Sequence, residues 1–183
     1  MSKESETQEL FEFMDELLNA SKHELEDTGG VAVVTYVRPL EEGGFSKEFG
    51  HKNETGKKPM ALIPYTENAN RDEWYTMIGK FVERFGAEFS VMVAESWYVE
   101  TNQEEFESNL DMQPSKHANR KECIMVIGIK YDKAGLITGQ HHVMQPFERN
   151  GEEIVYLELK RLGEDETEGD SLLAQVTARQ DLL

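Results

Sequence analysis

The residue most suggestive of chemistry in this sequence is Glu95, which lies within an alternating apolar stretch. Residues 87–99 alternate in the pattern of a strand, and the alternation places Glu95 on the same side as Val93 and Trp97. Burial of an ionised carboxylate is costly unless a cation or several hydrogen-bond donors meet it. The sequence therefore predicts a partner for Glu95, and Arg120 is the candidate.

A second carboxylate, Glu122, follows two residues after Arg120. If the strand at 87–99 pairs with residues 121–131, then Glu95, Arg120 and Glu122 come near one another at one end of a sheet. Two carboxylates there can hold a divalent metal or act as acid and base, while the arginine orients an anionic substrate. Four further candidates at this end are Asp111 as a metal ligand and Trp97, Ser115 and His117 as ligand-binding residues.

Two interpretations of this cluster stay open. In one, it is the site of a small metal-dependent hydrolase or ligand-binding domain. In the other, Glu95 and an arginine form a hydrogen-bonded ion pair that anchors a loop, because ion pairs also perturb carboxylates without doing chemistry. We favour the structural ion pair.

The same residues carry a resemblance to a known group of proteins. Glu95-Ser-Trp97, Pro114-Ser115 and Arg120-Lys-Glu122 form an E-x-W…P-S-x-x-x-x-R-x-E pattern. It resembles a pattern of uncharacterised bacterial and phage proteins. That group has no assigned activity, so the resemblance implies only a prokaryotic or viral setting.

Other chemically interesting residues give weaker signals. His141 and His142 are adjacent on a predicted strand, so their side chains point to opposite faces and cannot bind one metal without distortion. Glu158 and Lys160 match the E-x-K half of a nuclease signature. Cys123 lies in an apolar run, which is typical of a buried thiol rather than of a nucleophile.

The chain is strongly acidic, with 19 Lys and Arg against 36 Asp and Glu and a formal net charge of −17. That charge opposes direct binding to nucleic acid or to an anionic membrane surface. Acidic clusters at 4–27, 95–111 and 164–170 suit a basic protein partner, although charge that only keeps the protein soluble is the simpler explanation.

No P-loop, H-E-x-x-H or G-x-S-x-G motif occurs in the sequence. We therefore expect a non-catalytic binding or accessory protein that acts through protein–protein contacts, with the metal-dependent hydrolase or small-ligand-binding domain as the alternative. The N-terminus has no apolar secretory segment, and a single cysteine cannot form an intramolecular disulfide. Both features predict a cytoplasmic protein.

Two helices must help to position these residues. Apolar residues recur at helical spacing from Leu10 to Leu25, with Ser5 and Gln8 as a capping box, and this helix ends before Gly29. Its apolar stripe packs either on its own sheet or on a second copy of the chain. The second helix runs from an Asn70 cap to Gly86, and its apolar stripe includes Trp74, Met77 and Val82.

Six strands complete the predicted fold, at 31–37, 60–63, 87–99, 122–131, 136–147 and 154–162. The order α-β-β-α-β-β-β-β predicts an α+β sandwich, a mostly antiparallel sheet with both helices on one face. The domain covers 1–162, with a long arm or loop at 41–58 and a polar loop at 101–121. Residues 163–183 form an acidic, flexible tail.

Overall fold

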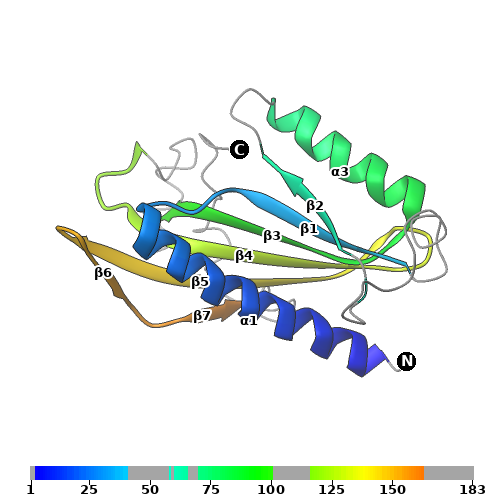
Figure 1. Ribbon diagram of the computed structural model, residues 1–183, viewed down its shortest axis with the longest axis horizontal. Coiled ribbons are helices and arrows are strands. Elements are labelled where there is room, and N and C mark those ends of the chain that lie inside the picture. The colour runs from blue at the N-terminus through cyan, green and yellow to red at the C-terminus, as the bar shows by residue number, and fades with distance from the viewer. Residues whose placement is uncertain (1–2, 41–57, 59, 66–69, 101–115, 163–183) are drawn as a thin grey trace.

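The computed structural model describes residues 3–40, 58, 60–65, 70–100 and 116–162. These residues form a seven-stranded sheet with two helices, α1 (Lys3–Thr28) and α3 (Arg71–Phe85) (Figure 1). The strands are β1 (Val34–Pro39), β2 (Ala61–Pro64), β3 (Ala87–Tyr98), β4 (Lys121–Tyr131), β5 (Ile137–Asn150), β6 (Glu153–Tyr156) and β7 (Lys160–Leu162). Their order is β2-β1-β3-β4-β5-β6, with β7 also paired to β5, and every pairing is antiparallel. The predicted α+β class and antiparallel sheet are confirmed.

The first helix packs along one face of its own sheet. Leu10, Met14 and Leu18 are buried in one cluster with strand residues such as Val91 and Val126. A Cβ added at Gly128 would lie 2.5 Å from Met14 Sδ, so the glycine permits the close approach of α1 to β4. The helix begins at Lys3, which places Ser5 inside it, so the predicted capping box is wrong.

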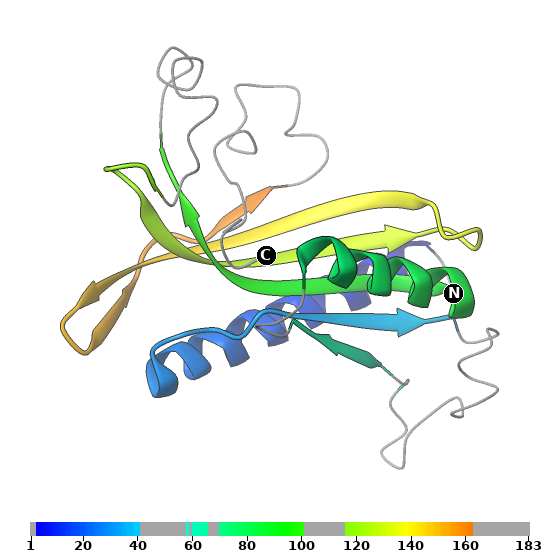
Figure 2. The same ribbon diagram turned by 90° about the horizontal axis from the view of Figure 1, so that it is seen from above.

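The second helix covers the opposite face of the sheet. Asn70 caps α3 by accepting a hydrogen bond from the Asp72 backbone N–H at 2.9 Å, and Gly86, with φ of 68°, ends it. Trp74 and Val82 are buried against residues of β1 and β2. In Figure 2, α3 lies in front of the strands and α1 behind them.

The expectation that both helices share one face is therefore wrong. The central strand β4 is apolar on both sides, with Ile124 and Val126 in the α1 cluster and Cys123 and Met125 buried on the other side. Both faces of such a strand need cover. One stripe prediction also fails, because Met77 of α3 is 48% exposed.

The last predicted strand, 154–162, is divided in two. Gln145 Nε2 donates to the carbonyl oxygen of Leu157 at 2.7 Å, and the Leu157 backbone N–H donates to the carbonyl of Pro146 at 2.9 Å. The chain leaves the ladder between β6 and β7, so Glu158 lies outside a strand and the E-x-K pair does not share one strand face. Strand β5 passes through Pro146 and continues to Asn150, beyond its predicted end.

Several predicted segments fall outside the described residues. They are the arm at 41–58 apart from Lys58, most of the loop at 101–121, and the tail at 163–183. No helix in the described part of the chain is both long and apolar enough to cross a membrane.

Candidate functional site

The carboxylate of Glu95 is buried, as predicted, but its cation is Arg149. Arg149 Nη2 donates to Glu95 Oε1 at 3.1 Å, and Arg149 Nε donates to both carboxylate oxygens of Glu122 at 3.2 Å. The other oxygen of Glu95 accepts from the Val31 backbone N–H at 3.2 Å, and Arg149 Nη1 donates to the carbonyl of Gly29 at 3.0 Å. We call Glu95, Glu122 and Arg149 the Arg149 cluster.

The prediction of Arg120 as the partner of Glu95 is wrong. The guanidinium of Arg120 lies over the ring of Trp97, 4.8 Å from its centroid. Arg149 takes the predicted place because β5 continues beyond Phe147, the partner of Glu122 in the ladder, and so carries residue 149 to the same end of the sheet.

The contacts of the Arg149 cluster hold several elements of the fold together. One guanidinium joins β3, β4 and β5 to the connection between α1 and β1 at Gly29. Both carboxylates that we considered as metal ligands are engaged by this cation, which competes directly with a metal ion. Within the described ranges, no group of three or more His, Cys, Asp or Glu side chains is arranged to hold a metal ion.

Among the remaining candidates, His117 and Trp97 lie within the described residues. His117 Nδ1 accepts from the Asn119 backbone N–H at 3.1 Å, which closes a local turn. Asp111 and Ser115 lie outside the described residues.

The histidine and cysteine predictions agree with the structure. The His141 ring makes an edge contact with Phe11 of α1, at 4.8 Å between centroids, whereas His142 lies on the α3 face, so the two point to opposite faces. Burial, and secondarily His141, lowers the pKa of His142, which keeps its imidazole neutral near pH 7. Cys123 is fully buried, and burial raises the pKa of its thiol, so it stays protonated.

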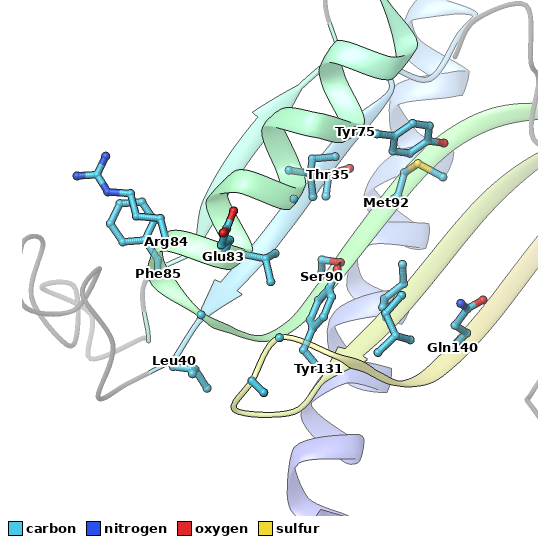
Figure 3. Close-up of a pocket in the computed structure, with 18 of the residues that line it drawn as sticks. Thr35, Leu40, Tyr75, Glu83, Arg84, Phe85, Ser90, Met92, Tyr131 and Gln140 are labelled. Carbon is cyan, nitrogen blue, oxygen red and sulfur yellow. Dashed lines mark hydrogen bonds between the residues drawn. The ribbon is translucent and has the colours of Figure 1, made fainter.

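A large cavity lies on the α3 face of the sheet. Its volume is about 840 Å³, and residues of α3, β3, β4, β5 and the β4–β5 turn line it, while one side is open to solvent (Figure 3). Trp74 of α3 is buried with residues of β1 and β2, whereas Tyr75 and Gly79 of the same helix line the space above the neighbouring strands. We call it the α3 cavity.

The floor of the α3 cavity consists of two rows of side chains that run across the strands. The rows are Thr35, Met92, Ile127 and His142, and then Ser90, Ile129 and Gln140. Neighbouring strands are about 4.8 Å apart, so the four-residue row spans roughly 14 Å. The centre of the floor is apolar, and its polar residues lie at the ends of the rows.

The polar groups of the floor are neutral. Ser90 Oγ and Tyr131 OH form a hydrogen bond of 2.8 Å, and Figure 3 shows the Tyr131 side chain extending toward Ser90. Burial raises the pKa of Tyr131, although the hydrogen bond with Ser90 partly opposes this effect. The charged residues that line the cavity, Glu83, Arg84 and Lys133, are exposed and come from the end of α3 and the β4–β5 turn.

Sequence reasoning missed the α3 cavity. Gly79 is a signal that was available, because a glycine within a helix costs about 1 kcal/mol relative to alanine and interrupts the side-chain cover of α3. Nothing lies within 4 Å of a Cβ placed there.

Comparison with known proteins identifies no similar protein. No protein-family model matches this sequence, and no curated protein or solved structure matches it either.

Proposed function

We propose that this protein is a non-catalytic binding protein for a small, largely apolar molecule, which occupies the α3 cavity. The observation that carries the proposal is the cavity itself. Its volume of about 840 Å³ falls within the range of roughly 300–1,000 Å³ that is usual for small-molecule sites. Such sites have mainly apolar walls and a few convergent polar groups, and the α3 cavity combines these features.

Binding would be driven by the removal of apolar surface from water. Met92, Ile127 and Ile129 are only partly buried, although they lie at the centre of the sheet. Each 100 Å² of apolar surface that a ligand covers contributes about 2.5 kcal/mol before the costs of association. A ligand on this floor covers the apolar surface of the sheet that α3 leaves partly exposed.

The absence of catalysis is part of the proposal. The Arg149 cluster lies on the opposite face of the sheet, where its carboxylates are held by the arginine and by the Val31 backbone. In the α3 cavity, the hydroxyls of Ser90 and Tyr131 bond to each other rather than to a base. This arrangement favours binding over the metal-dependent hydrolase that we considered from the sequence.

A basic protein partner and self-association stay predictions. Both rest on the sequence, the first on the net charge of −17 and the second on the stripe of α1, which packs on its own sheet in this structure. Occupancy of the α3 cavity is compatible with either.

The proposal is tested with N-phenyl-1-naphthylamine, a neutral dye whose fluorescence rises in apolar surroundings. We expect the wild-type protein to bind it at one site with micromolar affinity. Gly79→Phe should weaken binding at least about tenfold, because its ring enters open space in the α3 cavity. Gly79→Ala is the matched control and should bind as the wild type does.

Two outcomes would contradict the proposal. One is the absence of saturable binding to the wild type. The other is equal binding to wild type and Gly79→Phe, since the dye would then lie elsewhere, for instance on the exposed Leu62 or Leu136.

A further inference from the structure

Two hydroxyl groups in the α3 cavity are hydrogen-bonded to each other and keep one unused hydroxyl proton. Ser90 Oγ and Tyr131 OH lie 2.8 Å apart, and both residues line the cavity. One of their two hydroxyl protons makes the bond between them, and the second proton needs another acceptor. Among the described residues, neither hydroxyl makes a further hydrogen bond. The pair is therefore a donor toward the cavity.

The surroundings of the Ser90–Tyr131 pair disfavour a charged ligand group. Ser90 is 4% exposed, whereas the charged residues Glu83, Arg84 and Lys133 line the exposed rim. Figure 3 shows Arg84 beside Phe85 and directed away from the cavity. The two cations that line the cavity, Arg84 and Lys133, are exposed to water, so a ligand carboxylate that leaves water to reach the pair loses hydration without gaining a buried cation. The net charge of −17 also opposes the approach of anions.

We propose that the polar group of the ligand is an uncharged hydrogen-bond acceptor, such as a ketone, ester or ether oxygen, which accepts the second proton of the Ser90–Tyr131 pair. The apolar body of the same molecule lies on Met92, Ile127 and Ile129. This inference rests on the proposed function of the α3 cavity and specifies the chemical class of its ligand.

Three naphthalenes of nearly equal shape test the inference. They are 2-acetylnaphthalene, which has a carbonyl acceptor, 2-isopropenylnaphthalene, in which a CH₂ group replaces the carbonyl oxygen, and 2-naphthoate, which is anionic. Each is titrated against bound N-phenyl-1-naphthylamine. We expect both neutral compounds to displace the dye and the carboxylate to bind at least about tenfold more weakly than the ketone.

The decisive comparison uses the variant Ser90→Ala/Tyr131→Phe. Both hydroxyls must be removed, because either one left alone keeps a proton to donate. The variant should weaken the ketone about fivefold, as the loss of one net hydrogen bond implies, and leave the alkene within twofold. Unchanged binding of the alkene also shows that the variant folds and keeps its cavity. Ser96→Ala removes a buried hydroxyl that does not line the cavity and should leave both affinities unchanged.

Three results would overturn the inference. They are an equal change of ketone and alkene affinity in Ser90→Ala/Tyr131→Phe, no change of either, and tighter binding of 2-naphthoate than of the ketone. In each case the cavity still binds naphthalenes, so the proposed function stands. Failure of all three compounds to displace the dye would contradict the assignment of the dye to the α3 cavity, and with it the proposed function.

Discussion

Arg149 and Glu95, 54 positions apart in the sequence, are joined by a 3.1 Å ion pair at one end of the sheet. The same guanidinium binds Glu122 and the carbonyl of Gly29. It therefore joins three strands to the end of α1. The most suggestive chemical feature of the sequence thus has a structural role, and the α3 cavity lies on the other face.

Replacement of Arg149 should destabilise the protein more than replacement of Arg120. Arg149→Gln leaves the carboxylates of Glu95 and Glu122 without their shared cation, and the loss for a fully buried pair is about 3–5 kcal/mol. Since the Arg149 side chain is 31% exposed, we expect a loss of about 2–3 kcal/mol in the free energy of unfolding. Among the described residues, Arg120→Gln removes a contact with Trp97, and it should cost about 1 kcal/mol or less.

Urea unfolding of both variants checks this prediction. A double-mutant cycle with Glu95→Gln isolates the coupling between Glu95 and Arg149. Equal losses for the two arginine variants would show that Arg149 is no anchor.

Divalent cations should leave the thermal midpoint unchanged. The carboxylates of Glu95 and Glu122 are already bound by Arg149, so an added ion has to displace the guanidinium. We expect Mg²⁺, Mn²⁺, Ca²⁺ and Zn²⁺ to shift the midpoint by less than about 1 °C relative to EDTA, because a ligand of the folded state alone would raise it. An ion-specific rise of several degrees that disappears in Glu95→Gln would restore the metal-site hypothesis.

Removal of the Thr35 hydroxyl should not destabilise the protein. Within the described part of the chain, Thr35 Oγ1 is buried and has no hydrogen-bond partner. Thr35→Val replaces it with a methyl group of similar size, so we expect a gain of about 1 kcal/mol in the free energy of unfolding. Ser90→Ala is the contrasting variant, because it leaves Tyr131 without its partner and should cost about 1 kcal/mol. A loss in Thr35→Val similar to that in Ser90→Ala would contradict this reasoning.

Glu100 should contribute stability that disappears in acid. Hydrogen bonds from Lys121 and then Lys160 lower the pKa of Glu100 from 4.5 to about 2. A carboxylate with a lowered pKa in the folded state stabilises it above the unfolded pKa, and the contribution disappears as the pH falls from about 4.5 to about 2. Because the side chain is 44% exposed, the contribution is about 1 kcal/mol or less.

The thermal midpoints of wild type and Glu100→Gln, compared at each pH, measure this contribution. The wild type should melt higher at pH 6, and the two curves should converge near pH 2. A constant difference across that range would contradict the assignment.

Local patterns in the sequence were sufficient for most of the elements. The cap at Asn70, the alternation of residues 87–99 and the burial of Glu95 each depend on neighbouring residues, and the structure agrees with all three. The partner of Glu95 was not predictable in this way, because it depends on the register of β5 against β4 and on the continuation of β5 past Pro146. Register is set by tertiary packing, which local spacing does not report.

The α3 cavity was hidden for a related reason. The stripe on α3 predicts a buried face, but it does not say over which strands the helix lies. Trp74 and Val82 are buried with residues of β1 and β2, and this placement leaves Met92 and Ile127 only partly buried. The α3 cavity can be identified only when the position of α3 over the sheet is known.

The central claim, that a small apolar molecule binds in the α3 cavity, is tested most directly by the isoleucine methyl groups. Ile78, Ile127 and Ile129 line the cavity, while Ile124 and Ile154 lie with the α1 cluster on the opposite face and serve as internal controls. In protein with ¹³C-labelled isoleucine δ1-methyl groups, addition of N-phenyl-1-naphthylamine should produce intermolecular NOEs to the first three methyl groups and none to the two controls. NOEs to Ile124 or Ile154, or saturation with none to Ile127 and Ile129, would contradict the claim.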